Sequence, residues 1–303
     1  MKQYLEALRQ VLEQGEQRDD RTGVGTVSLF GMQQRYNLSE GFPAVTTKKL
    51  AWRACVGELL WMIEGSGDER RLAEITHGSR DGTVTIWTPN AQAPYWKPRA
   101  RYEGDLGRVY GVQWRHWKTY QQREAGSYKD SFGTWYSTPA GVVEQEVDQL
   151  QDLIQGIKKD PHGRRHILTA WNPGELDQMA LPPCHAFAQF YVSRDRRLSC
   201  QMYQRSCDMF LGVPFNIASY SLLTHMIAQV CDLAVGEFVH VLGDAHIYLN
   251  HVDQVREQLS REPLPLPTLH LNPNIKDITK FTMEDVCLDG YQNHGPIRAE
   301  MAV

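Results

Sequence analysis

The stretch Leu181–Asn216 reads LPPCHAFAQFYVSRDRRLSCQMYQRSCDMFLGVPFN, and it decides the fold class. FAQFYV and LSCQMYQ predict two successive strands, because they are short runs rich in aromatic and other apolar residues. The strongly apolar run over residues 215–230 predicts a buried helix directly after them. Strands and helices of this kind mix along the chain without regular βαβ alternation, which indicates an α+β fold rather than a doubly wound sheet.

Outward from this stretch, the same patterns predict the other elements. Helical spacing marks further segments at residues 5–12, 56–63, 143–157 and 247–259. Glycines at positions 15 and 65 end the first two of these helices, and the proline-rich REPLPLP follows the last. HILTAW and EFVHVLG predict two more strands, and DDRTGVGTVSLFGMQQRYNL predicts a glycine-containing turn followed by a hairpin.

A long segment between about residues 88 and 141 shows no periodicity and is rich in Tyr, Trp, Gly, Lys and Arg. Loops of this length are usually lids, insertions or interaction surfaces. The sequence contains no repeats and no low-complexity linker. We therefore expect one domain over residues 1–303 with a loop insertion at about 88–141, in which helices cover a mixed β-sheet.

The bulk composition restricts the class of protein. With 303 residues, 42% of them hydrophobic, the chain can bury a large core. A net charge of −4 argues against bulk nucleic-acid binding, including DNA, so any phosphate should be met by local arginines. No apolar run is long enough to cross a membrane, the N-terminus is not a signal peptide, and the six cysteines form no CxxC pair. A reduced, cytoplasmic protein without a metal site is the resulting expectation.

Cys184 is the candidate nucleophile. It stands between a double proline and His185, and Arg205, Ser206 and Asp208 follow on one short turn. A thiol, a cation and a carboxylate on linked segments are parts of a site that attacks an electron-poor ring. Taken alone, a single cysteine is more often a small buried hydrophobe, and that alternative stays open at this point.

Glu58 is the candidate for proton transfer. It lies among Leu59, Leu60 and Trp61 on the second predicted helix. A carboxyl group in apolar surroundings has a raised pKa, which suits it to relaying protons near neutral pH. The alternative for an isolated glutamate of this kind is a partly exposed helix acid.

Five motifs taken together resemble the thymidylate synthase family: PPCH, QRSCDMFLGVPFNIASY, GDAHIYLNH, RRHILTAWNP and the early DRTGVGT. The resemblance covers nearly the whole chain. It implies conversion of dUMP to dTMP, with 5,10-methylenetetrahydrofolate as the co-substrate that supplies both the carbon and the hydride. It also implies a homodimer in which two sheets pack back to back.

The resemblance implies a role for each matching residue. The catalytic set would be Cys184, Glu58, Tyr110, His185, Arg205, Asn216 and Asp208. The dUMP site would be formed by Arg21, Arg164, Arg165, Arg205, Ser206, Asn216, His246 and Tyr248, with Arg164 and Arg165 donated across the dimer interface. The folate site would be formed by Lys48, Trp87, Asp208, Leu211, Gly212, Phe215 and Ala302, and the tail Ala302–Val303 would fold over the ligands.

Three of these roles can be stated as chemistry. Arg205 would lower the pKa of the Cys184 thiol and also touch the substrate phosphate. The Asn216 amide would donate to one uracil edge group and accept from the adjacent N–H, although an asparagine that merely caps the apolar helix is the ordinary alternative. His185 would order water beside the thiol. For the pair Arg164 and Arg165, the alternative is a solvated basic turn.

Four positions depart from the family pattern, namely Ala51, Gly57, Thr88 and Arg108, and a longer insertion is expected over 118–141. These departures bear on the last steps of the reaction. Related phage pyrimidine hydroxymethylases share the early steps but add water in place of hydride. A dUMP hydroxymethylase is therefore the alternative function, while Asn216 argues against a cytosine base and Trp87 favours the synthase.

Hypotheses that assign the chain to other classes of protein have less support. A nucleotide-binding protein without turnover would not need both Cys184 and Glu58. A Cys–His hydrolase is disfavoured because Cys184 and His185 are adjacent, and neighbours in a strand point to opposite faces. Zinc binding would rest on the loose HxxxxH spacing of His246 and His251 alone.

Overall fold

The computed structural model describes residues 1–20, 22–129, 135–138 and 140–300. The helices are α1 (Lys2–Gln14), α2 (Trp52–Glu64), α3 (Glu69–His77), α4 (Thr88–Ala91), α5 (Gly111–Arg115), α6 (Gln149–Lys159), α7 (Gly212–Val230) and α8 (Val252–Leu259). Short 3-10 turns lie at Pro173–Gln178, Leu249–His251, Ile278–Lys280 and Met283–Asp285. The strands are β1 (Glu16–Arg18), β2 (Thr26–Asn37), β3 (Trp117–Arg123), β4 (Gly126–Lys129), β5 (Trp135–Thr138), β6 (Gly141–Val147), β7 (Ile167–Thr169), β8 (His185–Val192), β9 (Arg197–Asp208), β10 (Ala234–Tyr248), β11 (Thr268–Leu271) and β12 (Val286–Asp289).

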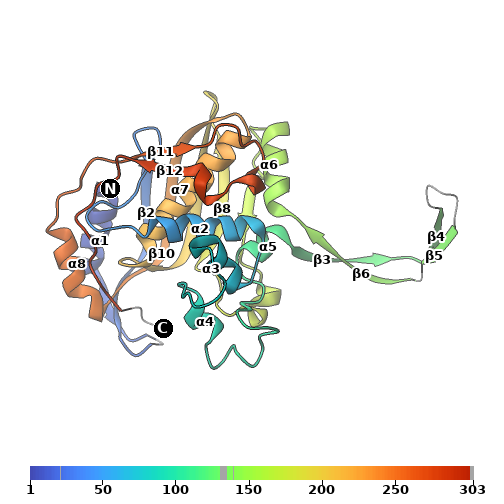
Figure 1. Ribbon diagram of the computed structural model, residues 1–303, viewed down its shortest axis with the longest axis horizontal. Helices are drawn as coiled ribbons and strands as arrows, with labels where there is room; N and C mark the ends of the chain where they lie inside the picture. The colour runs from blue at the N-terminus through green and yellow to red at the C-terminus, as the bar shows by residue number, and fades with distance from the viewer. Residues whose placement is uncertain (21, 130–134, 139, 301–303) are drawn as a thin grey trace.

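A six-stranded mixed sheet forms the centre of the molecule (Figure 1). Its strand order is β1-β2-β10-β9-β8-β7, with β9 and β10 parallel and the other neighbours antiparallel. The parallel pair requires a crossover, which α7 supplies by packing against both strands. The prediction of an α+β fold with a mixed sheet and covering helices is confirmed.

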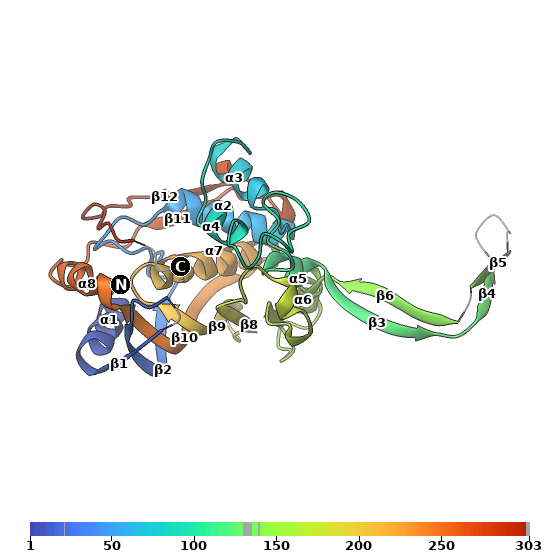
Figure 2. The ribbon, with the colours of Figure 1, turned by 90° about the horizontal axis from the view of Figure 1, so that it is seen from below.

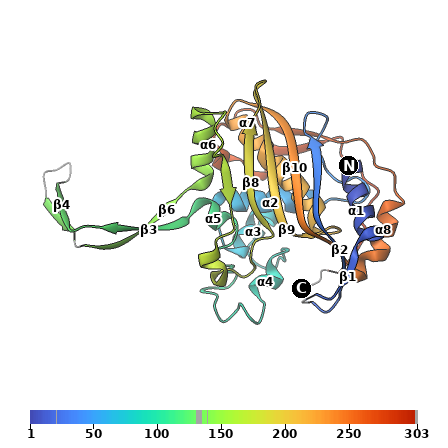
Figure 3. The same ribbon diagram turned by 180° about the vertical axis from the view of Figure 1, so that it is seen from behind.

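The two faces of the sheet differ (Figure 2). α7 and α2 lie over one face, and the other face carries no helix across β8 and β9 (Figure 3). On that open face, the ring of Phe187 stacks on Tyr203 and Tyr191 is 63% exposed. Exposed aromatic side chains on a sheet face are typical of an interaction surface.

α2 is buried over residues 55–63, because eight of these nine side chains are apolar or absent and Glu58 is the exception. Two glycines allow α3 and α5 to approach α2 closely. A Cβ at Gly57 would lie 2.2 Å from Oγ1 of Thr76 on α3, and a Cβ at Gly111 would lie 2.4 Å from the carbonyl oxygen of Met62. The second contact presses the start of α5 against α2, and this brings Tyr110 to the helix that carries Glu58.

A long two-stranded ribbon, beginning at Trp117, forms the second part of the segment predicted as a loop over 88–141. β3 and β6 pair antiparallel and project from the body of the molecule, and β4 and β5 continue the projection (Figure 3). The remainder of this segment contains α4 and α5. The loop prediction missed this ribbon, because alternation in its strands is weak where neither face is buried.

Three other element predictions need correction. The helix predicted over 143–157 begins only at Gln149, because Asp148 caps it by accepting a hydrogen bond from the Gln151 N–H, and the preceding residues belong to β6. The helix predicted over 247–259 begins at Val252, since β10 continues to Tyr248. The predicted hairpin is instead the single strand β2, which pairs with β1 and β10.

None of the helices in the described part of the chain has both the length and the apolar character of a membrane span. All six cysteines are free thiols, and four of them are buried. The described residues contain no cluster of three or more His, Cys, Asp or Glu side chains placed to hold a metal ion.

Candidate active site

A pocket of about 380 Å³ lies where three strands of the sheet reach the same end. Its walls include Cys184 from the turn before β8, together with predicted site residues from the ends of β9 and β10, namely Arg205, Ser206, His246 and Tyr248. These residues come together because β8 runs antiparallel to β9 while β10 runs parallel to it. Five residues predicted from distant motifs therefore share one pocket.

The turn that carries Cys184 is fixed by hydrogen bonds from both sides. The Arg205 side chain donates from Nε to the Pro183 carbonyl and from Nη2 to the Pro182 carbonyl, each at 2.9 Å. The Cys184 N–H donates to the Tyr110 hydroxyl at 2.8 Å, and the Cys184 carbonyl accepts from the Arg205 N–H at 2.8 Å. The double proline thus presents two carbonyl oxygens that hold the guanidinium beside the thiol.

Opposing effects act on the pKa of the Cys184 thiol. Burial raises the pKa of the Cys184 thiol, and the Arg205 guanidinium and hydrogen bonds from Tyr110 and Ser206 act in the opposite direction. The negative charge of Asp208 also raises it. The thiol is therefore mainly protonated at neutral pH.

Glu58 is buried, with 7% of its surface exposed, and its Oε1 accepts a hydrogen bond from Trp87 Nε1 at 2.6 Å. Burial raises the pKa of this carboxyl to about 7, although the bond from Trp87 opposes the change. The value agrees with the expectation from its apolar neighbours. The Trp87 ring meets Tyr110 edge-on at 5.7 Å, so a continuous set of contacts links Glu58 to the turn of Cys184.

His185 is buried behind the thiol. Its Nδ1 lies 2.8 Å from the Tyr220 hydroxyl, and its ring stacks on Tyr110 with centroids 4.2 Å apart. Burial lowers the pKa of His185 to about 3, so the ring is neutral at physiological pH. A neutral ring in this position can donate or accept hydrogen bonds but cannot supply a positive charge.

The start of α7 follows directly from β9 and gathers Asp208, Leu211, Gly212, Phe215 and Asn216. Oδ1 of Asp208 accepts hydrogen bonds from the N–H groups of Phe210 and Leu211 at 3.0 and 3.1 Å. Asn216 is half-buried in the second turn, so the alternative that it caps the helix is wrong. Its side-chain amide has no hydrogen-bond partner among the described residues.

Lys48 lies beside this helix start. It is buried, its Nζ donates to the Phe210 carbonyl, and the same nitrogen sits 3.5 Å from the centre of the Phe210 ring. Burial lowers the pKa of Lys48 to about 8. Lys48 is therefore not a solvated surface lysine.

Not every predicted residue reaches the pocket of this one chain. Arg164 and Arg165 are exposed and line a separate pocket with residues of α6. Arg21 and Ala302, with Val303, lie outside the described residues. The two exposed arginines are the residues that the sequence resemblance assigned to the site of a second copy.

Comparison with known proteins identifies the family. The family model for thymidylate synthase matches residues 2–303. A bifunctional dihydrofolate reductase-thymidylate synthase from Zea mays is 50% identical over 305 residues, covering 99% of this chain and 54% of the maize protein. The chain belongs to the thymidylate synthase family. It spans about half the length of that maize relative, and the resemblance found in the sequence motifs is confirmed.

Several pocket residues of this thymidylate synthase family member were not predicted. Asn90 from α4 and Leu181 face the same space as Cys184, as do Thr22 and Asp244. The loop before β2 is organised by Asp20, whose carboxylate accepts from the N–H groups of Thr22 and Gly25 at 3.0 and 2.7 Å. The motif DRTGVGT contained the signal for this loop, whereas Asn90 lies in the segment without periodicity.

The four departures from the thymidylate synthase pattern lie outside this pocket. Gly57 accommodates Thr76, as described above, and Ala51 precedes α2 at the surface. The Thr88 hydroxyl donates to Glu69 at 2.5 Å. The Arg108 Nε donates to Glu175 at 2.5 Å. Gly57, Thr88 and Arg108 each have a packing or hydrogen-bonding partner, and none of the four departures lines the space beside Cys184.

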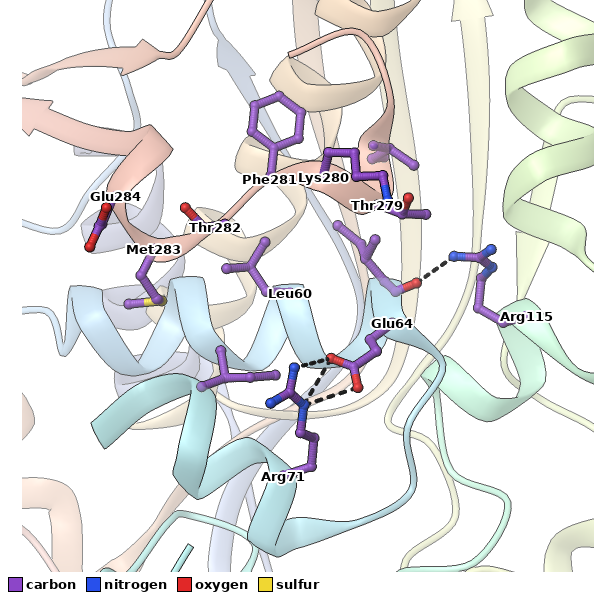
Figure 4. Close-up of a pocket in the computed structure, with 13 residues that line it drawn as sticks. Leu60, Glu64, Arg71, Arg115, Thr279, Lys280, Phe281, Thr282, Met283 and Glu284 are labelled. Carbon is purple, nitrogen blue, oxygen red and sulfur yellow. Dashed lines mark hydrogen bonds and ion pairs between the residues drawn. The ribbon is translucent and has the colours of Figure 1, made fainter. Parts of the chain in front are cut away.

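A second pocket, of about 730 Å³, lies between α2, α3 and the segment 278–284 (Figure 4). Its guanidinium groups are already engaged by the protein, since Arg71 binds Glu64 and Arg115 donates to the Ile63 carbonyl. Among the described residues, none that is expected to act in a thymidylate synthase reaction lines it. The candidate active site is therefore the smaller pocket around Cys184.

Proposed function

We propose that the protein is a single catalytic domain over residues 1–303 that converts dUMP to dTMP with 5,10-methylenetetrahydrofolate. The observation that carries this proposal is the position of Cys184, held between Arg205 and Tyr110 in a pocket that also contains His246 and Tyr248. Uracil C5 is a poor nucleophile until a group adds at C6, and a thiolate is suited to that addition.

In the first chemical step, the Cys184 sulfur would form a bond to C6 of the uracil. The electron pair of the C5–C6 double bond would then move toward C5 and O4, while the thiol proton leaves to a base. A dianionic phosphate near Arg205 and Ser206 would draw those donors toward the ligand. Asn216, whose amide lacks a partner among the described residues, would hold the base edge, and His246 and Tyr248 would bind the deoxyribose hydroxyl.

Glu58 would govern the proton at C5. With a pKa of about 7, its carboxyl can both accept and release a proton near neutral pH. Trp87 fixes one oxygen of this group, so the other is available to relay through water or through Tyr110. His185, neutral and bound to Tyr220, would keep water ordered beside the sulfur.

The residues at the start of α7 suit a folate. Leu211 and Phe215 are partly buried against the core, and Trp87 adds an aromatic wall, which fits a flat pterin ring. Asp208 would bind the pterin and Gly212 would let it approach closely, with Lys48 and the tail residue Ala302 completing the site. The bound folate supplies a one-carbon unit and a hydride, and this chain's residues exclude water around it.

Replacing Asn216 by aspartate is expected to shift the preferred substrate from dUMP toward dCMP. A carboxylate accepts from the exocyclic amine of cytosine but cannot donate to the uracil carbonyl. We expect the ratio of kcat/KM for dUMP and dCMP to change by about 100-fold or more, since an unpaired buried polar group costs 1–3 kcal/mol on each side. Asn90→Asp is the control, and an unchanged ratio in Asn216→Asp would show that this residue does not read the base.

The exposed pair Arg164 and Arg165 suggests a homodimer formed through the open face of the sheet, with each copy donating these residues to the other. The single variant Cys184→Ala should be inactive alone. The double variant that carries Arg164→Ala together with Arg165→Ala should also be inactive alone. When the two are co-expressed, mixed dimers would contain one complete site, so about a quarter of the parent activity should return. Equal inactivity of the mixture and its components would argue that each copy uses its own arginines.

The direct test is incubation of the protein with dUMP and methylenetetrahydrofolate. A synthase yields one dihydrofolate, seen by absorbance, for each methylated nucleotide, seen by mass. A product heavier by one further oxygen, without dihydrofolate, would instead identify a dUMP hydroxymethylase. Binding of dUMP without any turnover would leave a nucleotide-binding protein.

A further inference from the structure

Tyr110 adopts an unusual backbone conformation. Its φ is +31°, one of three positive values at non-glycine residues in the described part of the chain. Positive φ values at bulky residues are strained and persist only where the surroundings impose them. Because the Tyr110 hydroxyl accepts the Cys184 N–H, whatever imposes this conformation also fixes the thiol.

A buried polar cluster of Arg108, Gln113 and Glu175 lies close to Tyr110 in the chain. The Arg108 Nε donates to Glu175 Oε2 at 2.5 Å, and Gln113 Nε2 donates to the same oxygen at 2.7 Å. Gln113 Nε2 also donates to the Arg108 carbonyl at 2.9 Å. The side chains of Arg108 and Glu175 are only 13% and 9% exposed, so these bonds form largely out of contact with water.

This cluster brackets Tyr110 in the chain, since Arg108 precedes it by two residues and Gln113 follows it by three. The main chain is pinned as well, because the Arg108 N–H donates to the Gln178 carbonyl at 2.9 Å. The Arg108 Nη2 reaches the His116 carbonyl at 2.6 Å, directly before β3. One guanidinium therefore joins the turn before Tyr110, the 3-10 turn of Glu175 and the base of the ribbon.

We infer that Arg108 is a positioning residue that holds the Tyr110 hydroxyl against Cys184. The inference deepens the proposed function, on which it rests, by naming what keeps the nucleophile in place. Arg108 itself does not line the pocket of Cys184, so it would act only through Tyr110. The groups that face the thiol directly are Tyr110, together with Arg205, Ser206, Cys207 and Asp208 from β9.

The test is the pH dependence of Cys184 alkylation by iodoacetamide, followed by mass spectrometry of the peptide that carries this cysteine. Arg108→Met should release the Tyr110 side chain from its position beside Cys184. Without the hydrogen bond from the Tyr110 hydroxyl to the Cys184 sulfur, the thiolate fraction and the alkylation rate at pH 7 should fall by about tenfold. The kcat should fall, whereas the KM for dUMP should change by less than about twofold. Arg108→Lys, which keeps the charge beside Glu175, should recover part of both.

Arg108→Met leaves Glu175 buried without its cation, which can prevent folding. The double variant Arg108→Met with Glu175→Gln removes both charges and keeps an acceptor for Gln113. Its alkylation should remain slow although its thermal stability approaches that of the parent. A parent-like alkylation profile in the folded double variant would overturn the inference.

Arg261→Met is the matched control. Arg261 is similarly buried, binds Glu257 at 2.5 Å and donates to the Thr47 carbonyl at 2.9 Å, but it does not contact Tyr110. Its alkylation profile should match the parent, and an equal loss there would also overturn the inference. Alkylation does not require turnover. The alkylation result therefore tests the role of Arg108 even if the proposed reaction is wrong, and a wrong reaction would be seen as an inactive parent protein.

Discussion

Replacing Cys184 by serine is expected to lower turnover of dUMP by at least about 10⁴-fold while nucleotide binding persists. The hydroxyl is a far weaker nucleophile than a thiolate and cannot be ionised by Arg205 at neutral pH. The binding groups Arg205, Ser206, His246 and Tyr248 are unchanged by this substitution. Turnover is measured by dihydrofolate formation, and dUMP binding by calorimetry.

Cys287→Ala provides the control for this prediction, because Cys287 is an exposed thiol on β12 and lies outside the pocket. It should retain the parent rate. A Cys184→Ser variant that keeps substantial turnover would mean that another group adds to the base. Loss of dUMP binding together with turnover would point instead to disruption of the turn that Arg205 and Tyr110 fix.

Replacing Glu58 by glutamine is expected to lower kcat by about 10²- to 10⁴-fold, because a positioned acid–base group of matched pKa contributes that much. Glutamine can still accept the hydrogen bond from Trp87 but can neither take up nor release a proton. In the parent, the rate should change with pH around the Glu58 pKa of about 7. The variant should lose this inflection, which a pH–rate series from pH 5 to pH 9 would show.

The same carboxyl also affects stability. Its pKa is raised from an ordinary 4.5 to about 7 in the folded protein, so the folded state prefers the protonated form. Below pH 4.5 the group costs no stability. Between pH 4.5 and pH 7 the free energy of unfolding falls, because the carboxyl ionises in the unfolded chain while it stays protonated in the folded protein. Above pH 7, Glu58→Gln should therefore be more stable than the parent, by about 3 kcal/mol at most, and equal to it at pH 4.

Denaturant titrations at pH 4 and pH 8.5 would measure this difference. Glu13→Gln, at an exposed position on α1, should change the unfolding free energy little at either pH. If Glu58→Gln were less stable than the parent at pH 8.5, the carboxyl would be satisfied as an anion. Its part in proton transfer would then need another source of a suitable pKa.

The sequence predicted five residues of the pocket but not the contacts between distant segments that hold them. Cys184, Arg205 and His246 belong to dense motifs, and the sheet topology brings those motifs to one end. The contacts that the sequence could not predict are between distant segments, such as Tyr110 with Cys184 and Arg108 with Glu175. No local pattern encodes such contacts, because they depend on how α5 packs against α2.

The ribbon was missed for a different reason. A strand pattern is visible when one face is buried, and the described residues of β3 and β6 are all half-buried or exposed. Their residues pair through charges and polar groups, as in Lys118 with Glu144 at 3.0 Å. Sequence periodicity reports burial, so a projecting ribbon resembles a loop until its backbone pairing is seen.

The place of β10 in the sheet has a consequence for synthesis on the ribosome. β2 emerges early, but the neighbour that covers most of its length is β10, near the end of the chain. Until β10 is made, β2 presents an open edge that other nascent chains can pair with. We expect this protein to acquire its fold late in translation, and chains arrested before residue 234 to aggregate or to bind chaperones.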